Sequence, residues 1–296
     1  MKTIVTGGAG FIGSHIVDRL IELGHEVIVY DNLSTGKKEN INKKARFVNG
    51  DIRDLSVLGE AAKGADYVFH LAAQVSVPRS VENPKETFEI NLDGTKNIIK
   101  AFKEVQKIIF SSSCAVYGDN PKLPMTEDSE LKPLSPYAES KVMAEKALNE
   151  SKKPFVAFRY FNVYGPRQNP ETGYAAAIPI FVNKAIKNEE ITIFGDGEQT
   201  RDFVNVRDIA KANLLVLKKG SGIYNIASNK KMTINELAAL ILKHAQSKSA
   251  IKHEKERAGD ILHSLGDYSK ARKELGWIPE KEIAEGLTEY IKWLKK

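Results

Sequence analysis

The chain has 296 residues, 42% hydrophobic and 28% charged, enough to bury one large core or two closely packed ones. Its 44 lysines and arginines against 38 acidic residues give a net charge of +6, but the charges are interspersed, which argues against a nucleic-acid partner. One cysteine, Cys114, excludes an intrachain disulfide, and six scattered histidines form no ligand cluster, so we expect no metal site.

The start of the chain, "KTIVTGGAG", leaves no room for a signal peptide, and no apolar stretch approaches the length of a membrane span. We therefore expect no membrane partner and a cytoplasmic location, which suits a chain with a single cysteine. The modest positive charge suits an anionic small-molecule substrate.

Short apolar runs alternate with helical patterns through the first half of the chain. The predicted strands are residues 3–6, 26–31, 45–51, 66–73, 107–113 and 155–165. The predicted helices are residues 11–24, 85–105 and 135–150. This alternation predicts an α/β fold with a Rossmann-type, doubly wound parallel sheet.

The alternation loosens after Gly165. Helices are predicted at 175–188, 206–220, 233–246 and 281–296, and strands at 191–195 and 222–228. We interpret residues 1–165 as a dinucleotide-binding Rossmann domain. Residues 166–296 are interpreted as a smaller, mixed α/β substrate lobe that exchanges segments with the first domain.

The segment "TGGAGFIG" places Gly7, Gly10 and Gly13 between the first strand and the first helix. Glycines there let the backbone turn tightly and approach a pyrophosphate, which the helix N-terminus then binds. Asp31 ends the second strand, where a carboxylate accepts hydrogen bonds from ribose hydroxyls and repels a 2′-phosphate, so NAD is favoured over NADP. Structural turns are the alternative for both features when each is taken alone.

Tyr137 and Lys141, in "SPYAESK", are four residues apart and so share one face of a helix. An ammonium group nearby lowers the pKa of a tyrosine, which then accepts a proton from a sugar hydroxyl near neutral pH. Ser113 ends the strand at 107–113 and can bind the same oxygen. Alone, this spacing equally describes a surface pair on a helix; the glycine loop, Asp31 and the serines favour a catalytic role.

Taken together, ten segments make the sequence similar to the extended short-chain dehydrogenase/reductase family, and within it to the UDP-glucose 4-epimerase branch, whose relatives include enzymes acting on UDP-N-acetylglucosamine. The segments are "TGGAGFIG", "YDNLSTG", "GDIRD", "FHLAAQVSV", "INLDGTKN", "SSSCAVYG", "YAESK", "RYFNVYGPRQ", "FGDGEQTRDFVNV" and "RAGD". The resemblance covers nearly the whole chain.

The resemblance implies a catalytic triad and a complete set of NAD contacts. The triad is Ser113, Tyr137 and Lys141. The expected NAD contacts are Gly7, Gly10, Phe11, Ile12, Gly13, Asp31, Asn32, Ser34, Gly36, Asp51, Ile52, Leu71, Ala72, Ala73, Asn91 and Tyr160, besides Tyr137 and Lys141.

It also implies a UDP-sugar substrate held largely by the second lobe. The expected substrate contacts are Ser113, Asn162, Ala177, Ile178, Arg201, Arg257, Asp260 and Ser264. Arginine suits the diphosphate because its planar fork pairs with two phosphate oxygens. A small Ser264 beside C2 of the hexose leaves space for an N-acetyl group, unless the alignment slips by one residue and places His263 there.

The implied reaction inverts C4 of a UDP-hexose through a transient 4-keto sugar, on an enzyme that works as a homodimer paired through the 85–105 and 135–150 helices. The alternatives are other nucleotide-sugar enzymes, namely dehydratases and decarboxylases, or a non-catalytic NAD-binding or RNA-binding relative. Dehydratases need an acid and a base after the serine, where this chain has Cys114 and Ala115.

Overall fold

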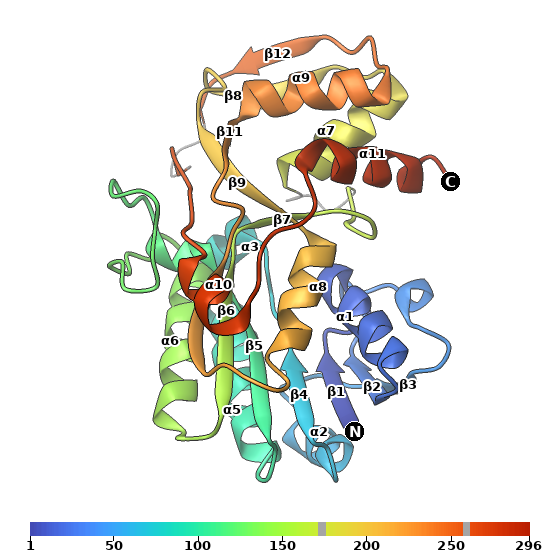
Figure 1. Cartoon of the computed structure of the whole chain (residues 1–296), viewed down its shortest axis with the longest axis vertical. Helices are drawn as coiled ribbons and strands as arrows, with labels where there is room; N and C mark the ends of the chain where they lie inside the picture. The colour runs from blue at the N-terminus through green and yellow to red at the C-terminus, as the bar shows by residue number, and fades with distance from the viewer. Residues whose placement is uncertain (171–175, 257–260) are drawn as a thin grey trace.

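The computed structural model describes residues 1–170, 176–256 and 261–296. Its centre is a seven-stranded sheet in the order β10-β6-β5-β4-β1-β2-β3, with every neighbouring pair parallel (Figure 1). The strands are β1 (Lys2–Thr6), β2 (Glu26–Asp31), β3 (Arg46–Asn49), β4 (Tyr67–His70), β5 (Lys107–Ser113), β6 (Phe155–Tyr160) and β10 (Gly222–Ile226). The predicted Rossmann-type fold is confirmed.

Both faces of this sheet are buried, because successive apolar residues of one strand point to opposite faces. In β1, for example, Ile4 packs into the core on one face and Val5 into the core on the other. One face is covered by α1 (Phe11–Glu22), α8 (Val206–Leu215) and α10 (Ser269–Leu275). The other is covered by α2 (Leu55–Ala62), α5 (Gly94–Ala101) and α6 (Pro136–Glu150), with the short α3 (Val77–Glu82) and α4 (Pro84–Phe88) packed against α6.

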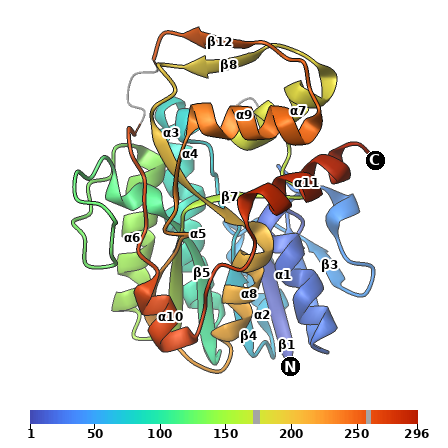
Figure 2. The same ribbon diagram turned by 45° about the horizontal axis from the view of Figure 1, so that its top comes forward.

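A third core lies beyond the end of the sheet (Figure 2). It is formed by α7 (Ala177–Lys187), α9 (Ile234–Ala245) and α11 (Ile283–Leu294), with the strand pair β8 (Ile191–Phe194) and β12 (Ile251–Glu254). A small sheet, β11-β9-β7, lies between this core and the main sheet; its strands are β7 (Asn162–Tyr164), β9 (Thr200–Asn205) and β11 (Lys231–Thr233).

Several elements differ from the sequence expectations. The apolar run at 155–165 is two strands, because β6 pairs with β5 in the main sheet whereas β7 pairs with β9. The predicted 85–105 helix contains a π-helical turn, Glu89–Asp93, between α4 and α5. The sequence analysis missed α2, α3, β9, β11, β12 and α10, which are short or carry charged residues inside their apolar pattern. None of the described helices is long and apolar enough to cross a lipid bilayer.

Candidate functional site

The carboxyl ends of the central strands meet at one edge of the sheet, facing the third core (Figure 1). In parallel α/β sheets, this is the edge at which ligands bind. The glycine loop leaves β1 at this edge, the segment 31–36 leaves β2, and the segment 71–73 leaves β4. Ser113 is the last residue of β5. The structure therefore brings most of the predicted cofactor contacts to one place.

The glycine loop is built for close approach to an anion. Gly7 has φ of 70°, and a Cβ there would lie 2.7 Å from the Ala72 backbone nitrogen; a Cβ at Gly13 would lie 2.2 Å from the Gly7 oxygen. Helix α1 starts after Gly10 with no side-chain cap and no acidic residue in its first turn. The first-turn N–H groups at Phe11 and Ile12 are thus suited to a pyrophosphate.

Asp31 lies beside this loop and is only 7% exposed. Its Oδ2 accepts from the Ala9 N–H at 3.0 Å and its Oδ1 from the Leu33 N–H at 2.8 Å. Burial raises the pKa of Asp31, while these two backbone donors lower it. Each carboxylate oxygen keeps a second lone pair, so the group can still accept from a ribose hydroxyl. A Cβ on Gly36 would lie 3.0 Å from Oδ1, so the loop closes directly over the carboxylate.

The loops after β2 and β3 are tied together by Asp51. Arg53 donates to both of its carboxylate oxygens, at 2.9 and 2.7 Å, and Asn32 donates to Oδ2 at 3.1 Å. The hydrogen bond from Arg53 holds the pKa of Asp51 down to about 2. The Asn32 oxygen accepts from the Ser34 N–H, and Ile52 is buried in the core. An adenine contact here therefore falls to the backbone of Asp51 and Ile52.

Asn91 connects the segment after β4 to the helix that carries Tyr137. It lies in the π-helical turn, a feature frequent at functional sites. Its Oδ1 accepts from the Gln74 N–H at 2.8 Å, and its Nδ2 donates to the Gln74 carbonyl at 2.9 Å and to Ser140 Oγ at 3.0 Å. Leu71, Ala72 and Ala73 precede this anchor, and Ala72 N–H also donates to Thr6 Oγ1 at 3.3 Å. Asn91 therefore fixes the cofactor wall against α6.

Tyr137 is in the first turn of α6, where Ser135 caps the helix and Pro136 occupies its first position. Ser113 at the end of β5 lies close enough to the Tyr137 hydroxyl to lower its pKa. Burial nevertheless raises the pKa of Tyr137 to about 12, against the lowering effect of Ser113. This differs from the expectation of a lowered pKa.

The reason lies in the orientation of Lys141. Its Nζ donates to the Ser111 carbonyl at 2.8 Å and lies 5.9 Å from the centre of the Tyr137 ring. Burial lowers the pKa of Lys141 to about 8, with Glu145 raising it. The ammonium is thus on the same helix face as Tyr137, as predicted, but it is hydrogen-bonded to β5, and burial outweighs the lowering effects on the pKa of Tyr137.

Tyr160 ends β6, next to the serines, and is 6% exposed. Its hydroxyl accepts from Asn213 Nδ2 at 2.8 Å. Burial raises its pKa, and the nearby Ser111 side chain lowers it. The structure therefore places Tyr160 as a packed and protonated side chain beside the serines that end β5.

On the substrate side, Asn162 and Arg201 lie on neighbouring strands of the small sheet. Asn162 Nδ2 donates to the Asp202 carbonyl at 2.9 Å, and Arg201 Nη1 donates to the Thr200 carbonyl at 3.0 Å and to the Leu262 carbonyl at 3.3 Å. Ala177 and Ile178 start α7, but the Ile178 side chain is 1% exposed within the third core. Only the backbone of Ile178 is therefore available to a nucleoside.

Ser264 lies near Cys114, the residue after Ser113, and lowers the pKa of its thiol. Ser264 is 5% exposed, and its N–H donates to the Thr200 carbonyl at 3.1 Å. His263 points elsewhere: its Nδ1 is hydrogen-bonded to Thr200 Oγ1 at 3.0 Å. The two predicted residues Arg257 and Asp260 lie outside the described part of the chain.

The sequence analysis overlooked three buried charged residues near these groups: Glu145, Arg159 and Asp202. Arg159 and Glu145 form an ion pair at 2.7 Å with side chains 3% and 5% exposed. Asp202 is fully buried and accepts four hydrogen bonds, from Ser228 N–H and Oγ and from the N–H groups of Asn229 and Gly266. A signal was available for Arg159, because a charge within the buried strand "FVAFRY" demands a buried partner.

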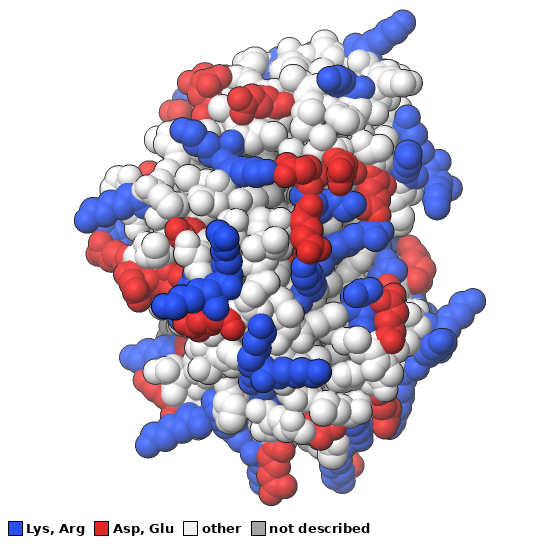
Figure 3. Space-filling model, viewed as in Figure 1, with Lys and Arg blue, Asp and Glu red and all other residues white. Residues whose placement is uncertain are grey.

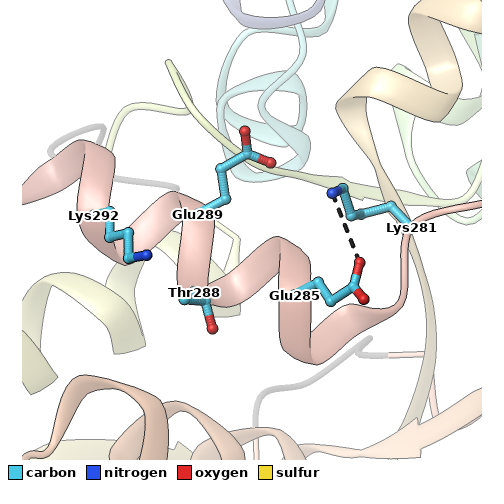
Figure 4. A pocket seen from close by; sticks show the side chains of 5 residues that line it. All are labelled: Lys281, Glu285, Thr288, Glu289 and Lys292. Carbon is cyan, nitrogen blue, oxygen red and sulfur yellow. Dashed lines mark ion pairs between the residues drawn. The ribbon is translucent and has the colours of Figure 1, made fainter.

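The face of the molecule drawn in Figure 3 is mixed in charge. Lysines, arginines and acidic residues alternate over the face drawn in Figure 3, without a continuous basic region. Lys281, Glu285, Thr288, Glu289 and Lys292 line a hollow along α11, where Lys281 pairs with Glu285 at 3.7 Å (Figure 4). This hollow contains none of the predicted site residues.

The glycine cradle, the carboxylate at the end of β2 and the serine, tyrosine and lysine at the end of β5 define a dinucleotide-dependent enzyme of the Rossmann class. Residues 3–227 match the model of the NAD dependent epimerase/dehydratase family. The chain therefore belongs to this family, and the predicted family, enzyme class and NAD cofactor are confirmed.

Similar proteins cover the chain from end to end. A putative UDP-glucose 4-epimerase of Methanocaldococcus jannaschii is 45% identical, over 99% of this chain and 98% of its own. The structure of a UDP-glucose 4-epimerase from Thermotoga maritima, solved with UDP-glucose, has a TM-score of 0.97 and 40% identity over 100% and 99% of the two chains. A UDP-N-acetylglucosamine 4-epimerase from Methanobrevibacter ruminantium, in complex with UDP-N-acetylmuramic acid, has a TM-score of 0.96 and 43% identity over 99% and 98%.

Proposed function

We propose that the protein is a UDP-glucose 4-epimerase, which interconverts UDP-glucose and UDP-galactose by inverting C4 of the hexose through a transient 4-keto sugar. The observation that carries the proposal is the placement of Ser113 at the end of β5 and of Tyr137 and Lys141 on the α6 segment bonded to β5, at the carboxyl edge of the sheet, next to a cradle that fits NAD. The full-length similarity to UDP-glucose 4-epimerases supports the same reaction.

The side chains of the protein handle the proton. Tyr137 is the acid–base group for the C4 hydroxyl, and Ser113 hydrogen-bonds the same oxygen and relays the proton. Lys141, fixed on the Ser111 carbonyl, provides a positive charge on the same helix face. Bound NAD would supply the hydride acceptor and donor, together with a positive ring that favours ionised Tyr137. A tyrosine that is protonated on its own is thereby activated only in the loaded enzyme.

The substrate side holds UDP while the sugar turns. Arg201 and Asn162 lie on adjacent strands of the small sheet, suited to the diphosphate, and Arg257 and Asp260 complete this set in our proposal. The first residues of α7, Ala177 and Ile178, meet the nucleoside. We assign residues 1–165 to NAD binding and residues 166–296 to the nucleotide sugar.

Dehydration is the principal alternative, and the residues after Ser113 disfavour it. Burial raises the pKa of Cys114 to about 12, so its thiol stays protonated at neutral pH and cannot serve as a base. Ala115 has no titratable group. The chain therefore lacks an acid–base pair at this position, where dehydration would need one.

The size of Ser264 extends the proposal to N-acetylated sugars. The side chain is small and is held against Cys114, and the neighbouring His263 is turned toward Thr200. We infer that a residue this small leaves room for an N-acetyl group on the substrate, and we propose that UDP-N-acetylglucosamine and UDP-N-acetylgalactosamine are also substrates. Turnover of UDP-galactose without any turnover of UDP-N-acetylgalactosamine would contradict this extension.

The test of the main proposal is product analysis. Purified protein with catalytic amounts of NAD should convert UDP-galactose to UDP-glucose, with no net reduction of the cofactor. A 4-keto-6-deoxy product would identify a dehydratase, and release of carbon dioxide from a UDP-hexuronate a decarboxylase; either result, in place of UDP-glucose, would overturn the proposal.

We also propose that the enzyme is a homodimer that pairs through residues 85–105 and α6. Large apolar side chains are exposed on α6 and next to it: Met143 of α6 at 40%, Leu134 just before α6 at 61%, and Val81 of α3, which packs against α6, at 61%. Exposed apolar side chains of this kind support a protein interface. Light scattering should give twice the chain mass, and Met143→Glu should shift the protein toward the monomer.

A further inference from the structure

Three consecutive serines at the end of β5 each contact a different residue of α6. The Ser111 carbonyl accepts from Lys141 Nζ at 2.8 Å, Ser112 Oγ donates to Glu145 Oε1 at 2.5 Å, and Ser113 lies near the Tyr137 hydroxyl. Residues 137, 141 and 145 follow one another at single-turn intervals along one helix face. The end of the strand is therefore joined to one face of the helix at three successive turns.

The contact between Ser112 and Glu145 adjoins a buried ion pair between Glu145 and Arg159. Arg159 of β6 lies directly opposite Ser112 in the sheet register. It donates to Glu145 Oε1 at 3.0 Å and to Oε2 at 2.7 Å, so Glu145 accepts from both strands at once. Ser112, Glu145 and Arg159 are 3%, 4% and 2% exposed. None of the three is among the groups that we assign to substrate or NAD.

Arg159 is itself fixed from the other side. Its Nη1 donates to Tyr117 Oη at 2.9 Å and to the Glu127 carbonyl at 3.1 Å, and Tyr117 Oη donates to Asn225 Oδ1 at 2.6 Å. Asn225 is a residue of β10. The guanidinium thus cannot follow the helix if α6 shifts, because its remaining donors are held by β10 and by the loops around it.

We propose that Ser112, Glu145 and Arg159 are positioning residues that set the register of α6 on β5 and thereby bring Tyr137 and Lys141 to Ser113 and Ser111. The physical reason is that a helix packed on a sheet through apolar contacts can slide or rotate by fractions of an ångström, whereas bidentate, charge-assisted hydrogen bonds fix direction as well as distance. A buried ion pair is often retained for such specificity and not for stability.

This inference rests on the proposed function, because its main readout is epimerisation. The sharpest variant is Ser112→Ala, which removes the link from Glu145 to β5 but leaves the ion pair intact. We expect kcat for UDP-galactose to fall about tenfold with KM unchanged, since small misplacements of reacting groups are costly for the chemical step. Ser112→Thr, which keeps a hydroxyl on the strand, should restore kcat.

The matched control is Thr3→Val, which removes a hydroxyl from a fully buried residue at the amino-terminal end of β1, where Thr3 Oγ1 bonds His25 at 2.9 Å. It should lower the melting temperature about as much as Ser112→Ala and leave kcat unchanged. Glu145→Gln is the second variant and should reduce kcat more than Ser112→Ala, because it weakens the contacts with both strands.

Unchanged kcat in Ser112→Ala, an increase in KM alone, or failure of Ser112→Thr to restore activity would overturn the proposal. A crystal structure of Ser112→Ala supplies a readout that does not depend on turnover: the contacts of Tyr137 with Ser113 and of Lys141 with Ser111 should both lengthen, and unaltered contacts would likewise overturn it. An inactive wild-type protein would instead refute the proposed function, and the crystal structure would still decide the inference.

Discussion

The two sides of the candidate site are built differently. On the catalytic side, Ser113, Tyr137 and Lys141 belong to one long strand and one long helix, and buried side-chain contacts such as Arg159–Glu145 join these elements. On the substrate side, Asn162 lies on the three-residue strand β7 and Arg201 on β9, and Ser264 lies on an irregular segment held by isolated bridges to Thr200 and Met125. The catalytic side is fixed by regular structure, whereas the substrate side depends on contacts between distant parts of the chain.

This difference suggests a division of roles. Damage on the catalytic side should reduce kcat, and damage on the substrate side should raise KM or change the sugar that is accepted. Each of the following changes tests one side of this division.

The largest effect is expected from Tyr137→Phe. Loss of the acid–base hydroxyl should reduce kcat by about 10²–10⁴-fold, the usual contribution of such a group. Because the ring still packs, the melting temperature should change little. The rate is measured by conversion of UDP-galactose, and full activity in this variant would remove Tyr137 from the mechanism.

Lys141 provides a test through stability. Burial lowers its pKa in the folded protein to about 8, from an ordinary 10.5, so within this window the unfolded chain binds more protons. The unfolding free energy of the wild type should therefore rise with pH across the window, by about 3 kcal/mol relative to Lys141→Met. Denaturant titrations from pH 7 to 10.5 measure the difference, with Lys146→Met, exposed on the same helix, as the control. A difference that is independent of pH would contradict the burial of this ammonium.

Asp202→Asn is the matching test on the substrate side. The amide would place an N–H₂ group against two of the four donors that now bind the carboxylate, those of Asn229 and Gly266. We expect a loss of about 1–3 kcal/mol in stability, and a higher KM with kcat nearly unchanged. The control is Asp196→Asn, at an exposed carboxylate that accepts from the Glu198 N–H. A fall in kcat alone would contradict the proposed division, in which changes on the substrate side raise KM.

The smallest effect concerns the sugar. Ser264→Tyr should reduce turnover of UDP-N-acetylglucosamine on the order of tenfold or more and leave UDP-glucose turnover largely intact, because the larger side chain fills the space beside C2. Parallel assays with both sugars measure the ratio of kcat/KM. An equal loss for both sugars would mean that Ser264 supports the fold and does not select the substrate.

The same contrast explains what the sequence could predict. The glycine loop, Asp31 and the Tyr137–Lys141 pair are local patterns with a fixed spacing, and the structure brings them to one edge of the predicted sheet. The direction of the Tyr137 pKa was wrong, because burial and the orientation of Lys141 depend on the packing of α6 against β5. The roles assigned to the site residues stay predictions.

The substrate side was harder to predict from the sequence, because its contacts join residues that are far apart in the chain. Asp202 acquires its hydrogen-bond donors only in the folded chain, from Ser228, Asn229 and Gly266, which lie up to 64 residues away in the sequence. The strand β9 that carries Arg201 mixes charged and apolar residues, so it showed no periodic signal. A local sequence pattern does not predict hydrogen bonds between residues so far apart in the chain.

The position of β10 has a consequence for biosynthesis. This strand completes the edge of the main sheet beside β6, yet it follows β6 in sequence only after three further strands and two helices. A nascent chain that has emerged only as far as β6 thus presents an unpaired, apolar strand edge, the kind of surface that promotes aggregation. We expect the ribosome-bound chain to need shielding, for example by a chaperone, until about residue 226 is out of the exit tunnel.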